Sequence, residues 1–317
     1  MIEARGYNPG LPPPATMPTS MTIITYQARL LSTALLACAT AGAHAAVTVR
    51  DDAGNSVTVA KPAQRIIAMA PHITELLFAA GGGERVVGVM NYSDYPEAAK
   101  RLPLVGSNAT IDMERVLALR PDLLVVWKSG NTAGQLEQLK SLGIPIFYSD
   151  PQKLEEVATS LTRLGQLMGT EPAARKAAQD YRQRIARLSA TYAQRPVVRV
   201  FYQIWEKPLF TLSGEHIVSD VIRVCGGQNV FAGLKVPAPT VSTEAVLQEN
   251  PEAIIGGVAR DAESGINIWR QYRGMQAVQR DNLFMLGGEQ LVRATPRIAD
   301  GVAALCERLE TARRRRP

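Results

Sequence analysis

The chain has 317 residues, of which 46% are hydrophobic and 20% are charged, and its net charge is +6. The apolar fraction excludes disorder over most of the length, and no stretch reaches the ~18 apolar residues that predict a membrane span. Four positive charges belong to residues 313–316, which we expect to form a solvated terminus, so the remainder is nearly neutral. A nearly neutral body lacks the basic face that nucleic-acid binding requires.

Residues 1–45 have the pattern of an export signal. Arg29 precedes an apolar run at residues 30–41, and Ala43 and Ala45 supply the small side chains that a signal peptidase reads. We therefore predict that the chain is exported and cleaved after residue 45.

Two details of this segment have a second interpretation. Residues 1–20 are rich in Pro and Gly, which indicates an over-extended gene start with Met17 or Met21 as the initiator. Residues 35–38 resemble a lipobox, which would acylate Cys38 and make the protein a lipoprotein instead of a soluble one.

Export also bears on the cysteines. If Cys38 leaves with the signal, Cys225 and Cys306 remain. Two cysteines in an oxidising compartment favour a disulfide, and two separate buried thiols are the alternative.

After a predicted hairpin at residues 47–49 and 56–59, strands alternate with helices, which is typical of mostly parallel sheets covered by helices. In the first half we expect strands at 66–70, 86–89, 123–127 and 145–148, and helices at 73–80, 112–119, 135–142 and 154–168. One long helix follows at 171–192, and Pro196 ends this pattern. The second half has predicted strands at 197–202, 253–255 and 283–286, and helices at 217–224, 243–248 and 296–309.

The two halves resemble each other. Residues 114–125 and 244–255 share four of twelve identities, each with a helix, a Pro and a strand in the same order. The predicted organisation is a signal and over-extended start at 1–45, an α/β lobe at 46–169, a linking helix at 170–194, a second α/β lobe at 195–310 and a basic tail at 311–317. Two such lobes imply a cleft between them, where ligands usually bind.

Catalytic equipment is not visible in the sequence. His72 and His216 are the two histidines after the signal; they have no metal-ligand spacing, and we take His216 to be a surface residue. There is no phosphate-binding loop of the GxxxxGK[ST] type and no recognisable nucleophile elbow. An exported protein of two lobes without these features is more typical of a binding protein than of an enzyme.

Several motifs extend this interpretation. They are APHITEL at 70–76, NYSDYP at 91–96, MER at 113–115, LRPDL at 119–123, VCGG at 224–227 and RATPRI at 293–298. Together they closely resemble the periplasmic cobalamin-binding proteins of bacterial ABC uptake systems, over residues 65–309. Haem and ferric-siderophore receptors share much of the same pattern.

This resemblance implies two rigid lobes that hold a corrinoid largely by aromatic faces. The matching ligand-binding positions are Tyr92, Trp127, Arg293 with Glu289 nearby, and Pro71 and His72 in a loop of the first lobe. Two expected tryptophans are replaced by Asn108 and Ala238, and Trp205 lies in a loop where the family has an aromatic residue. The resemblance also pairs Cys225 with Cys306.

The residue chemistry leaves alternatives at these positions. Trp127 follows an apolar strand, where open α/β sheets bind ligands, although it could instead cap the core. Tyr92 and Tyr95 could both pack within a turn, and Arg293 could form a surface ion pair. His72 could contact or coordinate a metal centre, or its ring could bond to the backbone.

Glu114 and Glu244 each lie in the first turn of equivalent predicted helices. A carboxylate there offsets the positive helix end by ~0.3–1 kcal/mol, which suffices to explain either residue alone. The resemblance implies a further role, because the family docks on arginines of a two-fold permease through glutamates at these positions.

The sequence therefore predicts a monomeric periplasmic substrate-binding protein that captures cobalamin or a related corrinoid and delivers it to an ABC permease dimer in the inner membrane. It would need no cofactor and no metal ion, and bind no nucleic acid. The alternatives are a haem or ferric-siderophore receptor of the same class and an exported enzyme that uses the same cleft.

Overall fold

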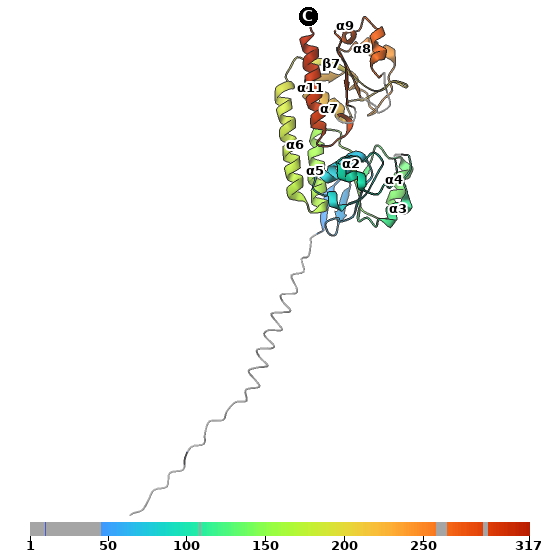
Figure 1. The fold of residues 1–317 in the computed structure, drawn as a ribbon, viewed down its shortest axis with the longest axis vertical. Coiled ribbons are helices and arrows are strands. Elements are labelled where there is room, and N and C mark those ends of the chain that lie inside the picture. Colours follow the sequence, from blue (N-terminus) through green and yellow to red (C-terminus); the bar gives the residue numbers. More distant parts are fainter. Residues whose placement is uncertain (1–9, 11–45, 108, 258–264, 288–290) are drawn as a thin grey trace, which may run out of the picture. The chain divides into compact units, whose positions relative to one another are not determined.

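The computed structural model describes residue 10 and residues 46–107, 109–257, 265–287 and 291–317 (Figure 1). Residues 46–317 form one compact unit. The apolar run of the predicted signal and Cys38 lie outside the described residues. None of the helices in the described ranges is both long and apolar enough to cross a lipid bilayer.

The first lobe is built on a parallel sheet with the strand order β4-β3-β5-β6. The strands are β3 (Ile66–Ala68), β4 (Val86–Val89), β5 (Leu123–Trp127) and β6 (Ile146–Ser149), preceded by an antiparallel hairpin of β1 (Val47–Arg50) and β2 (Ser56–Val59). The helices are α2 (Pro71–Ala79), α3 (Met113–Ala118), α4 (Ala133–Lys140) and α5 (Leu154–Met168), with 3-10 turns η1 (Gly83–Arg85) and η2 (Glu97–Arg101).

The second lobe has the strand order β11-β10-β7-β8, and β9 also pairs with β7. Its strands are β7 (Val198–Trp205), β8 (Phe210–Thr211), β9 (Gly227–Asn229), β10 (Ala253–Gly257) and β11 (Leu283–Leu286), of which only β8 is antiparallel. Its helices are α7 (Ile217–Val224), α8 (Thr243–Glu249), α9 (Gln276–Gln279) and α11 (Ile298–Arg314), with the 3-10 turn η3 (Asn267–Gln271). The predicted α/β class with mostly parallel sheets is confirmed.

Three helices begin and end at the predicted residues. These are α5, α6 (Glu171–Tyr192) and α7, whose apolar residues recur at helical spacing. The sequence did not reveal β8, β9 and α9, because segments of two to four residues are too short to show a period.

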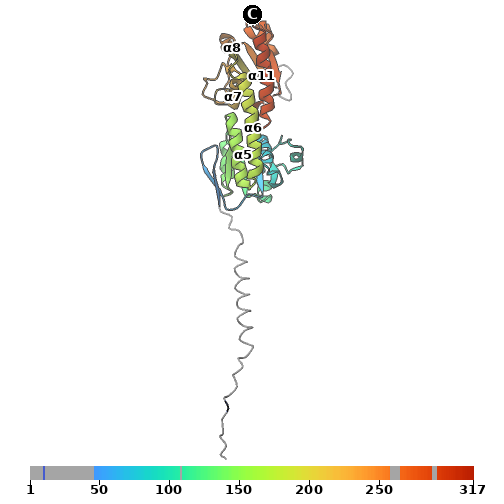
Figure 2. The same cartoon turned by 90° about the vertical axis from the view of Figure 1, so that its left-hand side faces the viewer.

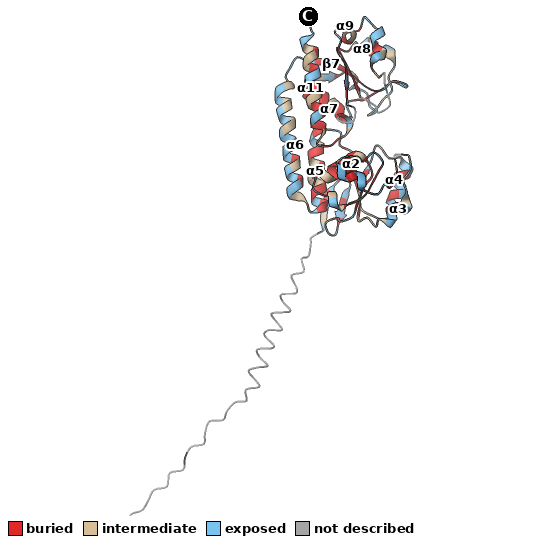
Figure 3. Ribbon diagram, in the orientation of Figure 1, coloured by how far each residue is buried: buried red, intermediate tan, exposed pale blue. Residues whose placement is uncertain are grey.

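Helix α6 packs beside α5 in the first lobe and beside α11 in the second (Figure 2). Gly169 ends α5 at a left-handed φ of 66°, where a residue without Cβ carries no steric penalty. Gly165 allows a close approach, since a Cβ there would lie 2.2 Å from the Cβ of Ala174. Figure 3 shows buried residues along α5 and exposed ones along the outer face of α6.

The two lobes share a core as well as a connecting helix. One cluster of buried apolar side chains includes Leu161 of α5, Tyr181 of α6, and Val218 and Ile222 of α7. The Tyr181 hydroxyl donates to the Leu154 carbonyl at 3.0 Å, which ties α6 to the start of α5. The lobes are therefore held by packing on several helices, not by α6 alone.

A disulfide joins Cys225, at the end of α7, to Cys306 in α11. Their Cα atoms are 4.6 Å apart and both residues are fully buried. The predicted pairing is confirmed in the structure, and it fixes the last helix to the second lobe.

The prediction of a solvated basic tail at 311–317 is wrong, because α11 continues to Arg314 and the following arginines bind the second lobe. Arg313 donates to the carbonyls of Pro196, Cys225 and Gly226. Arg316 makes two hydrogen bonds to the Glu252 carboxylate, at 2.7 and 2.8 Å. Two carbonyls that follow α7, one that precedes β7 and a buried acid supply partners that the local sequence could not reveal.

Removing the disulfide should destabilise the protein strongly. The bond closes a loop between residues 81 positions apart, and the chain-entropy argument gives about 4 kcal/mol for a loop of that size. We expect Cys225→Ala/Cys306→Ala to lose that much of the free energy of unfolding in urea. As a control, reductant should not change the stability of the double variant. If the protein without substitutions, unfolded in the absence of reductant, titrates with two free thiols, the disulfide does not form.

Candidate functional site

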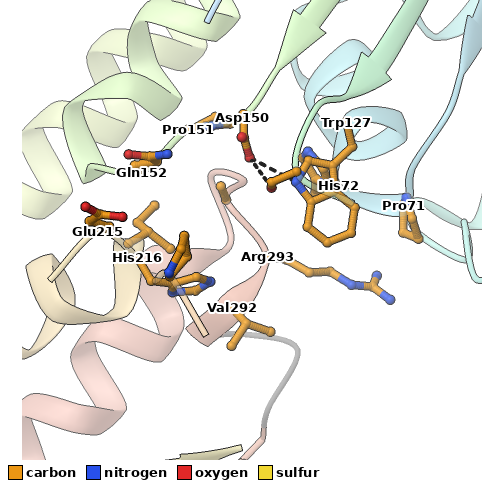
Figure 4. A pocket seen from close by; sticks show the side chains of 14 residues that line it. Pro71, His72, Trp127, Asp150, Pro151, Gln152, Glu215, His216, Val292 and Arg293 are labelled. Atoms are coloured by element: carbon orange, nitrogen blue, oxygen red, sulfur yellow. Dashed lines mark hydrogen bonds between the residues drawn. The ribbon is translucent and has the colours of Figure 1, made fainter. Parts of the chain in front are cut away.

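A cavity of about 280 Å³ lies between the two lobes (Figure 4). Residues of both lobes line it: Pro71, His72, Trp127, Ser129, Asp150, Pro151 and Gln152 from the first, and Glu215, His216, Ile217, Pro237, Val292, Arg293 and Ala294 from the second. Pro71, His72, Trp127 and Arg293 were singled out from the sequence, and the structure brings these four together.

Trp127 ends β5 and forms one wall of the cavity. Its Nε1 donates to Oδ1 of Asp150 at 3.0 Å, and the Ser129 hydroxyl donates to the same oxygen at 2.7 Å (Figure 4). The ring of His72 meets the indole edge to face, with 5.3 Å between ring centroids. The indole is therefore held in one orientation although Trp127 is 38% exposed.

Gly130 completes this arrangement. A Cβ on Gly130 would lie 1.8 Å from the Trp127 ring, so the indole packs directly on the backbone of the following turn. In the sequence this packing is visible only as a Gly three residues after a Trp. No sequence rule connects that spacing to a binding site.

His72 and His216 approach the cavity from opposite lobes. His72 lies in the first turn of α2 rather than in a loop, and burial together with the charge of Arg293 lowers its pKa to about 4. His216 precedes α7, and its Nδ1 accepts from the Val218 amide at 3.2 Å. Burial lowers its pKa to about 4 as well. The expectation that His216 is a surface residue is wrong, because α7 packs against the first lobe and draws its N-terminus into the cleft.

Arg293 connects the lobes electrostatically. Its guanidinium lies 3.1 Å from the Glu75 carboxylate and 3.4 Å from that of Asp94, both in the first lobe. Arg297 also pairs with Glu75, at 2.7 Å, and its guanidinium lies 3.9 Å from the Tyr95 ring centroid. The sequence interpretation missed Glu75, although a carboxylate within an apolar helix requires a cation when it is buried.

Tyr92 and Trp205 are not among the described residues that line this cavity. Tyr92 is 57% exposed and has a left-handed φ of 64°. Trp205 is 50% exposed, its Nε1 donates to the Lys207 carbonyl at 3.1 Å, and it borders a second cavity of about 300 Å³. Asn108 and Glu289 lie outside the described residues, and Ala238 is exposed.

Glu114 and Glu244 occupy equivalent positions in the first turns of α3 and α8, and both are exposed. Asp112 and Ser242 cap these helices through side-chain acceptors. Hydrogen bonds to its own amide and to Ser242 lower the pKa of Glu244. Within the described ranges, neither glutamate takes part in an ion pair.

The arrangement suits non-covalent binding. The described part of the chain contains no group of three or more His, Cys, Asp or Glu side chains that could hold a metal ion. An indole, two neutral imidazoles and a few polar groups instead line a concave surface, which is the usual composition of a small-molecule site.

The periplasmic binding protein family matches residues 66–289, which include most of both lobes and most of the cavity lining. This chain belongs to that family. As a periplasmic binding protein, it has two lobes with the cavity between them.

Several relatives align with this binding protein over nearly their whole length. A vitamin B12-binding protein of Vibrio parahaemolyticus is 38% identical over 264 residues, which are 83% of this chain and 95% of that protein. The crystal structure of the periplasmic vitamin B12-binding protein BtuF of Vibrio cholerae is 40% identical with a TM-score of 0.74, and covers 80% of this chain and 98% of that one. A periplasmic heme-binding protein of Pseudomonas aeruginosa is 28% identical with a TM-score of 0.65, covering 77% and 91%.

Gly130→Ala should displace the Trp127 indole without disturbing the core. The added Cβ overlaps the ring, and the partly exposed indole can swing toward solvent, so we expect stability to change by less than ~1 kcal/mol. The near-UV circular dichroism and tryptophan emission should change because the bond to Asp150 is lost. Gly134→Ala in α4 is the matched control, since nothing lies within 4 Å of its Cβ. Identical spectra for Gly130→Ala and the native protein would contradict this packing.

Proposed function

We propose that this protein is the periplasmic substrate-binding component of an ABC importer, that it captures cobalamin between its lobes, and that it delivers the ligand to a permease. The observation that supports this most directly is the interlobe cavity with Trp127 on its wall. The relatives at 38–40% identity, which are matched over nearly their whole length, are named for vitamin B12. Binding and release would involve no chemical step.

The size of the cavity bears on how a corrinoid would bind. A volume of about 280 Å³ is just below the ~300–1,000 Å³ of small-molecule sites, and a corrinoid is larger than this cavity. The macrocycle would therefore extend beyond the cavity over exposed aromatic side chains. Tyr92, Tyr95 and Trp205 supply such surfaces, and flat rings favour stacked contacts with them.

The position of the cavity also supports a role for Arg293 in the proposed site. It lines the cavity while it pairs with Glu75, so a ligand edge there would meet a fixed guanidinium plane. Pro71 and His72 would contact the ligand from the first lobe, with His72 neutral at the pH of the periplasm because its pKa is lowered.

A second candidate function is haem binding, because a heme-binding protein is 28% identical over 91% of its length. Purified protein distinguishes the two, since a bound corrinoid and a haem have different visible spectra.

Cobalamin should bind at a ratio of 1:1 with a dissociation constant in the micromolar range or below, which corresponds to about −8 kcal/mol. Trp127→Ala should weaken binding by about 1–3 kcal/mol, because it removes the largest apolar wall of the cavity. Leu117→Ala, at an exposed residue of α3, should have no effect. Calorimetric titration with cobalamin and with hemin distinguishes the two candidate functions. Tight hemin binding without detectable cobalamin binding would overturn the proposal.

Docking on the permease is the second part of the proposal. Glu114 and Glu244 are exposed, begin equivalent helices of the two lobes and are free of ion pairs to described residues. Such a pair fits arginines that a two-fold partner presents twice, and removing either should weaken the complex by raising its dissociation rate.

Vesicle uptake tests this docking. Glu114→Ala/Glu244→Ala should nearly abolish uptake while cobalamin affinity stays unchanged, since neither residue lines the cavity. A role at the helix ends alone predicts a lower melting temperature with normal uptake. Normal uptake by the double variant would leave only that role.

A further inference from the structure

The interlobe cavity presents hydrogen-bond acceptors from both lobes. Asp150 and Gln152 line it from the first lobe, and Glu215 lines it from the second. Asp150 uses Oδ1 for Trp127 and Ser129. In the described part of the chain, its other oxygen and the Glu215 carboxylate have no hydrogen-bond donor. Glu215 is exposed, so its carboxylate and the second Asp150 oxygen can accept hydrogen bonds from a ligand that reaches them.

The one cation among the described lining residues is already neutralised. The Arg293 side chain is 13% exposed and pairs with Glu75 and Asp94. Arg297 shares Glu75, so two arginines and two carboxylates form a group without net charge. An anionic ligand group would have to displace a buried partner before Arg293 could serve it.

The other basic residues described near the cavity do not place a positive charge on its lining. His72 and His216 are uncharged at neutral pH because burial lowers their pKa values to about 4. The Lys153 ammonium donates to the Gly214 carbonyl at 3.0 Å and is not among the residues that line the cavity. Lys128 lines an adjacent polar cavity together with Arg163, where three carboxylates outnumber the two cations: Asp52, Asp150 and Glu156.

We propose that these charges select the ligand by the groups on its rim, so that the cleft accepts a tetrapyrrole with carboxamide side chains and rejects one with carboxylates. This inference rests on the proposed function, because it assumes a macrocycle in this cleft. A carboxamide NH2 donates to Asp150 and Glu215, whereas a carboxylate can only accept. Burying that charge without a cation is costly, and such a cost against the wrong ligand gives specificity.

The test compares two corrinoids with the same ring. Dicyanocobinamide carries carboxamides, and dicyanocobyrinic acid carries carboxylates at the same positions. The mature protein should prefer the amide form by tenfold or more at low salt. Raising the ionic strength should narrow the difference by improving only the acid, because salt screens charge repulsion and leaves steric exclusion unchanged.

Two variants locate the effect. Glu215→Lys should improve binding of the acid about tenfold relative to the amide, while Glu84→Lys, an exposed residue of η1 that is absent from the lining, should not. Glu75→Gln should shift the preference in the same direction by releasing Arg293 from one partner.

Two results overturn the inference. Equal affinity of the native protein for both corrinoids would show that charge does not select, although the proposed function would stand. A preference that neither salt nor Glu215→Lys alters would assign the discrimination to shape. If neither corrinoid binds although cobalamin does, the inference fails and the proposed function stands. If cobalamin does not bind either, both fail.

Discussion

A buried carboxylate determines how the two lobes face each other. Glu75 is 3% exposed and lies in α2 among apolar neighbours, so it is tolerated only with cations at hand. Those cations, Arg293 and Arg297, come from the segment that leads into α11 in the other lobe. The ion pairs thus couple the start of α2, which supplies His72, to the start of α11. The disulfide and the terminal arginines fix α11 in turn.

The position of Trp127 on the wall of the cavity depends on contacts between neighbouring strands of the first lobe. Parallel strands β5 and β6 end at the same edge of the sheet, which places Trp127 beside the residues that follow β6. Asp150 can therefore accept from the indole and from Ser129 at once. Because Gly130 leaves room for the ring and His72 packs against it in an edge-to-face contact, the orientation of Trp127 is set before any ligand arrives. Preorganisation of this kind lowers the entropic cost of binding.

Shared packing accounts for the relation between the lobes better than a hinge does. The core cluster includes side chains of α5, α6, α7 and α11, and α5 and α7 are in contact. Lys153 and Leu154 also reach the second lobe directly, through hydrogen bonds to the Gly214 carbonyl and the Asp220 carboxylate. Moving one lobe would break these contacts together with the Glu75 ion pairs.

The sequence by itself determined the alternation of strands and helices and the bounds of α5, α6 and α7, because each depends on local periodicity. It favoured a disulfide between Cys225 and Cys306, which the resemblance also implied and the structure contains. Resemblance singled out Trp127, His72 and Arg293, which the structure places on one cavity. Only the tertiary structure decided what those residues touch. The partners of Trp127 and Arg293, Asp150 and Glu75, are 23 and 218 residues away in the sequence. Packing of distant helices places His216 on the cavity and gives the terminal arginines partners in the second lobe. The local sequence pattern shows which face of a helix or strand is apolar. It does not show which charged side chain of the other lobe will pair with a residue on that element.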